Sequence, residues 1–213
     1  MHSSEVSMCA NISIADEIKL YKQAGYDGVV LTNHYCPEWF ESINATWDEK
    51  IKQYLFPYKQ ALKLCGDMAV ILGMEIRFEE NYNDYLVYGI TEPFLLDHPK
   101  LYKLGIEKFH KLAVKNGLFV AQAHPFRPYM IPANPAFLDG VEAFNAHPWH
   151  DSQNSLALEF GIDHGLALLA GSDCHEVEHA TNTYVLLPKK ACNSKELAAV
   201  LKSGDIIIQL DRI

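Results

Sequence analysis

Short apolar segments alternate with longer amphipathic ones along almost the whole 213-residue chain. The apolar segments have the length of buried strands, and they cover residues 28–34, 68–78, 84–90, 118–124, 140–145, 166–170, 183–187 and 205–210. The amphipathic segments have a helical period, and they cover residues 16–25, 48–65, 101–116, 151–164 and 194–202, with Pro57 expected to kink or split the second. Strands separated by helices indicate βα units whose parallel strands are buried on both faces. Seven or eight such units favour an α/β barrel, with an open doubly wound sheet as the alternative.

The composition indicates a globular protein, and the net charge argues against binding to polyanions. Hydrophobic residues make up 49% of the chain and charged residues 21%, and no linker-like stretch divides it, so we expect one domain over residues 1–213. The formal net charge of −9 opposes binding to nucleic acid or to an anionic membrane surface. A small phosphorylated substrate needs only a local positive site and stays compatible with this charge.

The cysteines and the N-terminal residues predict a cytoplasmic location. The 5 cysteines are scattered without CxxC pairs, which argues against a disulfide framework or a thiolate metal site. The opening MHSSEVSMCA lacks the apolar core of a signal peptide. No apolar run reaches the roughly 18–20 residues of a membrane span.

Several predicted strands end in a side chain that can bind a metal ion. They deliver His34, Glu75, His124 and the pair Asp173 and His175. The carboxyl ends of barrel strands converge on one face, so these side chains should lie together. Imidazoles and carboxylates without thiolates suit zinc, manganese or iron. We therefore predict a metal centre in which Glu75, Asp173 and His175 are catalytic. A histidine or aspartate at the rim is expected to protonate the leaving group, and His175 is the first candidate if it is not held on a metal ion.

Two arginines are candidates for binding a phosphoryl group. Arg77 lies two residues after Glu75 and should face the same side of the strand, although an ion pair with Glu75 or Glu79 explains it equally well. Arg127 follows His124 closely, and a plain surface arginine is the alternative there.

The other polar residues near the strand ends are weaker candidates. His147 lies near the same rim, after a strand whose Glu142 and Asn145 could orient ligand histidines. The remaining histidines are expected to be solvated or structural, and they are His98, His110, His150, His164 and His179.

The motifs HSSEVS, TNHY, GMEIRF, AHPFR and GSDCHE, in this order, resemble those of the PHP (polymerase and histidinol phosphatase) domain over nearly the whole chain. The resemblance implies a distorted (β/α)7 barrel, of which the first strand is truncated here. It also implies two or three divalent metal ions (Zn, Mn or Fe) and hydrolysis of phosphoesters.

The resemblance also implies a ligand set. The matching positions are His2 for the second histidine of an opening HxH element, His34, Glu75 as a bridging carboxylate, His124, Asp173 and His175, with Glu5 as a loosely spaced further ligand. Three departures accompany this match. The first HxH histidine has no counterpart, Asn33 replaces an aspartate, and no histidine stands near residues 88–90.

The sequence thus favours an enzyme that hydrolyses a small-molecule phosphate ester with metal-activated water. Two alternatives stay open. One is an amidohydrolase-like enzyme that attacks carbon, and the other is a degenerate barrel that binds metal or ligand without catalysis. No GxSxG, P-loop or Rossmann glycine motif supports a serine hydrolase, a nucleoside triphosphatase or a dehydrogenase.

Overall fold

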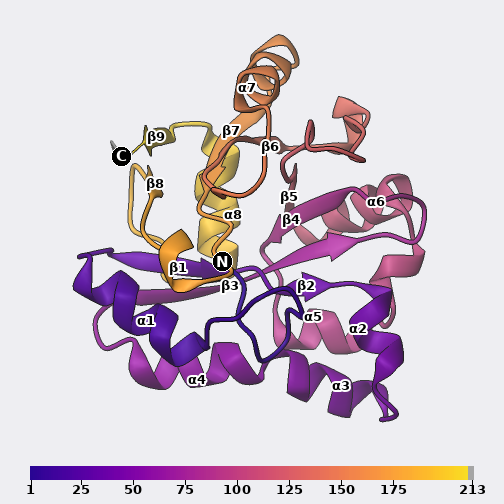
Figure 1. Cartoon of the computed structure of the whole chain (residues 1–213). Helices are drawn as coiled ribbons and strands as arrows, with labels where there is room; N and C mark the ends of the chain where they lie inside the picture. The colour runs from indigo at the N-terminus through magenta and orange to yellow at the C-terminus, as the bar shows by residue number, and fades with distance from the viewer. Residues whose placement is uncertain (211–213) are drawn as a thin grey trace.

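The computed structural model describes residues 1–210, so the last three residues of the predicted domain lie outside the described part. Helices and strands alternate over most of the chain (Figure 1). In chain order they are α1 (Ile14–Gln23), β1 (Gly28–Leu31), β2 (His34–Tyr35), α2 (Pro37–Ser42), α3 (Trp47–Tyr54), α4 (Phe56–Leu64), β3 (Ala69–Arg77), β4 (Asp84–Tyr88), α5 (Glu92–Asp97), α6 (Ile106–Asn116), β5 (Phe119–Gln122), β6 (Gly140–Asn145), α7 (Asn154–Asp163), β7 (Ala167–Gly171), β8 (Thr183–Leu186), α8 (Ser194–Ser203) and β9 (Ile207–Leu210).

The main sheet has the order β1-β3-β4-β5-β6-β7, with β2 also paired to β3. Its strands are parallel except β4, which runs antiparallel to both β3 and β5. The expectation of uniformly parallel strands was therefore wrong at this position. Only residues 78–83 connect β3 to β4, and so short a connection allows a hairpin but not a crossover.

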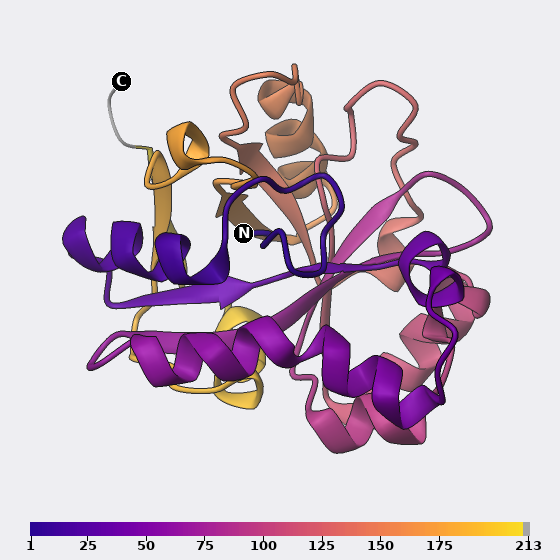
Figure 2. The same cartoon turned by 60° about the horizontal axis from the view of Figure 1, so that its bottom comes forward.

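The sheet is curled but not closed. β1 and β7 stand at the two ends of its hydrogen-bonded order, while β8 and β9 form a separate antiparallel pair. A cavity of about 870 Å³ lies between these elements and is lined by residues of β1, β7 and β8. Figure 2 shows the N-terminal segment crossing the mouth of the curled sheet. The fold is thus a mixed α/β half-barrel, and a complete (β/α)7 barrel is not observed in the described residues.

The central strand β3 separates two apolar clusters. Its residues Leu72, Met74 and Ile76 face outward into the larger cluster, which includes aromatic side chains of α2 and α3. Its Ile71 faces the concave side, where the apolar face of α8 packs. Each large side chain buried in this way stabilises the fold by roughly 1.5–3 kcal/mol. Glu75 shares the concave side with Ile71 because side chains alternate along a strand.

Local signals in the sequence explain where the helices begin and end. Thr46 and Glu49 form a capping box at the start of α3. The predicted helix over residues 48–65 is split just before Pro57, which lies in the first turn of α4. The predicted helix over residues 101–116 begins later, at Ile106, and ends at Gly117 with a φ of 68°. Within residues 1–210, none of the helices combines the length and apolar character needed to span a membrane.

Candidate metal centre

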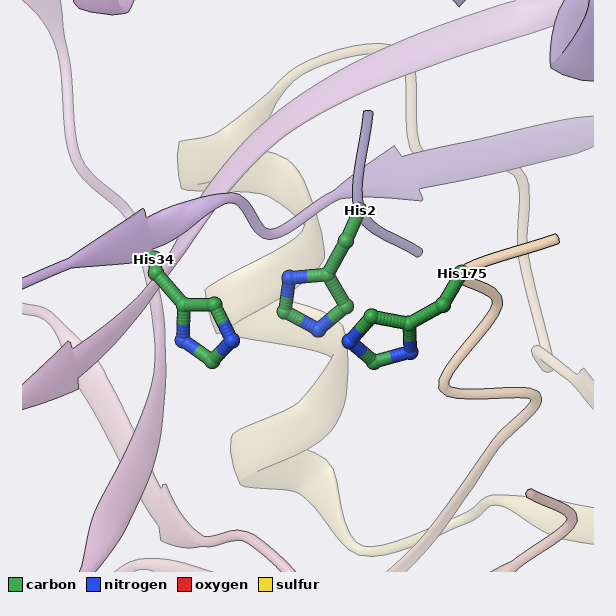
Figure 3. A group of neighbouring side chains, drawn as sticks. All are labelled: His2, His34 and His175. Carbon is green, nitrogen blue, oxygen red and sulfur yellow. The ribbon is translucent and has the colours of Figure 1, made fainter. Parts of the chain in front are cut away.

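The mouth of the half-barrel collects side chains from five separate parts of the chain. Glu75 comes from β3 and stands in register with His34 at the start of β2. His124 follows β5, while Asp173 and His175 follow β7. The N-terminal segment adds His2, whose ring stacks on those of His34 and His175 at centroid distances of 4.5 and 4.6 Å (Figure 3).

The carboxylates of Glu75 and Asp173 are at the centre of this group. His2 Nε2 lies 3.1 Å from Glu75 Oε2 and 3.2 Å from Asp173 Oδ1. On the other side of Glu75, Oε1 is 3.5 Å from His124 Nε2 and 3.9 Å from His34 Nδ1. Asp173 Oδ1 also lies 3.6 Å from His175 Nδ1. The structure thus brings together six of the seven predicted metal ligands.

Glu5 is the predicted ligand that the structure places elsewhere. Its carboxylate accepts hydrogen bonds from the backbone N–H of Ile14, at 3.1 and 3.3 Å. Because Ile14 opens α1, the carboxylate lies where a negative charge stabilises the helix. Glu5 therefore caps this helix, and its loose spacing in the sequence could not distinguish the two roles.

Burial and mutual charge set the protonation of the group. Burial raises the pKa of Glu75, but the charge of His2 and hydrogen bonds from His124 and His2 outweigh it and hold that pKa well below its usual range. Burial lowers the pKa of His2, yet Glu75 and Asp173 raise it to about 9. The two carboxylates are therefore ionised at neutral pH and share one imidazolium.

The outer histidines behave differently. Burial, reinforced by the positive charge of His2, lowers the pKa of His34 to about 4 and that of His175 to about 4. His175 Nδ1 lies 2.7 Å from the carbonyl oxygen of Asp173, so this nitrogen donates and Nε2 carries the free lone pair. A neutral imidazole with a fixed tautomer suits a metal ligand better than the proton donor expected from the sequence.

Two of the central residues have an unusual backbone. His124 has a φ of 30° and Asp173 a φ of 47°. Residues other than glycine and asparagine rarely adopt a backbone conformation in this left-handed region. Such conformations cost of order 1–3 kcal/mol and persist where the surroundings enforce them. In His124, a hydrogen bond of 3.0 Å from its backbone N–H to Glu142 Oε2 holds the turn.

Arg127 holds Asp173 in place. Its Nη2 donates to Asp173 Oδ2 at 2.9 Å, to Asn145 Oδ1 at 3.0 Å and to Ser152 Oγ at 3.0 Å. The Asn145 amide in turn donates to Glu142 Oε2 and to Asp173 Oδ2. Arg127 is therefore a largely buried part of the centre, which excludes the plain surface arginine, and its contacts are those of a residue that orients a carboxylate.

Arg77 makes a different contact from those anticipated. It forms a two-pronged ion pair with Asp84, with distances of 3.0 and 2.8 Å, rather than with Glu75 or Glu79. Asp84 stands opposite Arg77 in the β3–β4 register, and it can share an ion with His34 and Glu75. Sequence reasoning missed Asp84 because its position depends on the antiparallel turn of β4.

The donor set fits divalent ions. Three sets of side chains at the centre each offer ligand atoms that lie within 4.8 Å of one another. These sets are His2–Glu75–Asp173, His34–Glu75–Asp84 and His2–His34–His175. The buried Nδ1 of His124 has no hydrogen-bond partner among residues 1–210. Buried carboxylates and imidazoles without thiolates are the ligands that zinc, manganese and iron accept.

The comparisons with known proteins agree with this fold. Residues 151–206 match the family model described as PHP-associated. No curated protein matches the chain. Among solved structures, PsfC from Pseudomonas syringae has a TM-score of 0.62 at 16% identity, covering 86% of this chain and 77% of PsfC.

Two further structures cover almost the whole chain. A protein from Bifidobacterium adolescentis, named provisionally as a metal-dependent phosphoesterase, has a TM-score of 0.53 at 15% identity and 94% and 93% coverage of the two chains. An amidohydrolase from Chromobacterium violaceum, with bound sulfate and no metal, has a TM-score of 0.56 at 14% identity and 97% and 96% coverage. The PHP-associated match over residues 151–206 and the fold shared with these structures support a relationship to the PHP-domain family.

Proposed function

We propose that this protein is a metal-dependent hydrolase that cleaves a small-molecule phosphate ester, in the cytoplasm. The observation that carries the proposal is the pair of buried carboxylates, Glu75 and Asp173, surrounded by four imidazoles within 4 Å of a carboxylate oxygen. Two divalent ions, or three, are the cofactors that such a donor set would hold. The names of the structurally similar proteins are consistent with hydrolytic chemistry.

The residues divide into holding and orienting roles. His2, His34, Glu75, His124, Asp173 and His175 would hold the ions, and Glu75 belongs to two of the three candidate groups. When bound, such ions lower the pKa of a water molecule and stabilise charge on phosphoryl oxygens. Arg127 and Asn145 keep Asp173 in one orientation through the hydrogen bonds described above.

Arg77 is the cation best placed to bind substrate. Its side chain is 30% exposed, whereas that of Arg127 is 12% exposed and surrounded by acceptors. The guanidinium lies next to Asp84, beside the His34–Glu75 pair. A partly exposed arginine at the edge of a carboxylate centre can bind a phosphoryl oxygen while it keeps its ion pair.

Activity assays with defined substrates test the proposal. With added manganese, we expect turnover of p-nitrophenyl phosphate or bis-p-nitrophenyl phosphate and none of a panel of cyclic amides. Turnover of amides alone would establish the carbon-centred alternative. Absence of any turnover in a protein that carries its metal would favour the degenerate barrel.

Variants connect that activity to the centre. Glu75→Gln and His124→Gln should lower kcat by at least about 100-fold and lower the metal content. Glu159→Gln and His164→Gln, at exposed positions of the same chain, are the matched controls and should change neither quantity. Equal activity of Glu75→Gln and Glu159→Gln would contradict the assignment of this centre.

A further inference from the structure

A second group of imidazoles lies beside the carboxylate centre. His147 follows β6, and His179 ends the short 3-10 turn Val177–His179. Their rings are 4.5 Å apart between centroids, and the ring of His147 is 5.2 Å from that of His175. One nitrogen from each of the three histidines lies within 4.8 Å of the other two.

His179 is the unexplained member of this group. The sequence suggested a solvated side chain, but the structure buries it completely, at 0% exposure. Neither of its ring nitrogens has a hydrogen-bond partner among residues 1–210. A buried polar group without a partner destabilises the folded state, and native proteins rarely leave one in that state. A ligand that accepts the lone pair of one ring nitrogen would remove that cost.

The surroundings of the group suit a cation that binds imidazole. All three candidate ligands are imidazole nitrogens, without a carboxylate or a thiolate among them. Trp149, itself exposed, packs edge-on against His179, with the ring centroids 4.4 Å apart. A ring of three histidines with one position left open is a ligand arrangement that zinc adopts in proteins.

We propose that His147, His175 and His179 bind a divalent cation, with zinc preferred, at a site separate from the Glu75 and Asp173 carboxylates. His150, whose exposed ring lies 4.6 Å from that of His147, is a candidate for a fourth ligand. The site stands on the geometry of these imidazoles and does not depend on which bond the enzyme hydrolyses.

The hydrogen bonds of the ligands define what binding requires. His175 Nδ1 donates to the Asp173 carbonyl, so Nε2 is its ligand atom. His147 Nδ1 accepts the backbone N–H of Trp149 at 3.2 Å. Coordination through His147 Nε2 therefore requires the ring proton to move to Nδ1, and the hydrogen bond from Trp149 is then lost.

The shared residue couples the two groups. His175 also lies in the group with His2 and His34, as Figure 3 shows. Its Nε2 has one lone pair and serves one ion at a time. An ion held by His147 and His179 therefore takes His175 away from the centre, and an ion at the centre does the reverse.

Zinc stoichiometry tests the proposal. Because the freed His175 can serve an ion in the His2–His34–His175 group, zinc is counted in a His34→Gln background, which removes that group. Equilibrium dialysis at a buffered free zinc concentration, followed by elemental analysis, should give one zinc per chain fewer when His179→Gln or His147→Gln is added to this background. The matched control His164→Gln removes an exposed imidazole and should leave the count of the background unchanged. Unchanged stoichiometry in both folded variants would overturn the proposal, whatever the enzymatic activity.

A second measurement does not depend on the variants folding. Wild-type crystals soaked in zinc should show an anomalous-scattering peak within bonding distance of His147 and His179, in addition to any peak beside Glu75 and Asp173. A peak at the carboxylates with none at these two histidines would also overturn it. Because zinc at the second site is counted without a substrate, this result is distinct from failure of the hydrolase assignment.

Discussion

One imidazole nitrogen, Nε2 of His2, lies 3.1 Å from Glu75 Oε2 and 3.2 Å from Asp173 Oδ1. The two carboxylates come from β3, the second strand in the sheet order, and from the loop after β7, the last strand, so His2 connects the two sides of the open sheet. Their charges keep the ring protonated, with a pKa of about 9. A metal ion at this place must replace that proton, which makes ion binding depend on pH.

Proton release should therefore accompany ion binding. Between pH 7 and 9, we expect the affinity for zinc or manganese to rise by up to about tenfold per pH unit, because His2 must lose its proton before an ion can bind there. Isothermal titration calorimetry in buffers of different ionisation enthalpy measures the protons released. His2→Gln should release about one proton fewer, and equal release from both proteins would contradict the role given to His2.

Replacing Arg127 should disturb the centre through Asp173. Arg127→Ala removes the hydrogen bond to Asp173 Oδ2, and we expect metal affinity to fall by about 10–100-fold. Arg77→Ala breaks an ion pair with Asp84 instead, and we expect it to raise KM more than it weakens metal binding. Metal dissociation constants and steady-state kinetics of the two variants separate these effects. A larger loss of metal affinity in Arg77→Ala would reverse the two assignments.

Glu17 should make the protein less stable at alkaline pH. Its side chain is buried in α1, and burial raises its pKa to about 8. The folded chain keeps this carboxyl group protonated up to about pH 8, whereas the unfolded chain loses the proton near pH 4.5. The stability that the protonated group contributes is therefore complete below pH 4.5, and it is lost as pH rises through 8.

Glu17→Gln removes that dependence. From pH 5 to pH 8, the free energy of unfolding of both proteins is expected to change. The decrease in the Glu17→Gln variant should be smaller than that in the wild type by about 2–4 kcal/mol. Urea denaturation at both pH values measures this difference. The exposed Glu159→Gln should follow the wild type, and the same slope in Glu17→Gln would show that Glu17 is not the titrating group.

Gly171 leaves the space that Glu142 needs. A Cβ atom at this position would lie 2.6 Å from Glu142 Oε1. Glu142 is held by the backbone N–H of His124 and by the amide of Asn145, so Gly171→Ala should push it against His124. We expect about 1–3 kcal/mol of lost stability and weaker metal binding. Thermal unfolding with and without zinc measures both, and an unchanged response to zinc would contradict this coupling.

Much of the centre could be predicted from the sequence because strand ends converge. Glu75, His124 and Asp173 each follow an apolar segment, and the parallel strands that carry them deliver those ends to one mouth. The alternation of side chains along a strand also predicts that Glu75 and Arg77 lie on the same face of the sheet. These expectations needed only the alternation of side chains along a strand, which the structure preserves.

Other features depend on contacts between distant segments. The partner of Arg77 is Asp84, which requires the antiparallel course of β4. That course had a signal in the sequence, since six residues between two strands are too few for a helical crossover. Burial of His179 had no comparable signal, because it depends on how the loops after β6 and β7 pack against each other. Closure of the barrel was inferred from the number of units, and counting them does not show whether the first and last strands meet.

The bridge across the open side of the sheet is a single peptide at the start of the described chain. Thr32 N–H donates to the Met1 carbonyl, and His2 N–H donates to the Cys174 carbonyl, each at 3.0 Å. The backbone that carries a metal ligand therefore also acts as a clasp between β1 and the loop after β7. An ion bound by His2 would stabilise this closed arrangement, so we expect the Thr32 amide proton to exchange more slowly when the centre is filled.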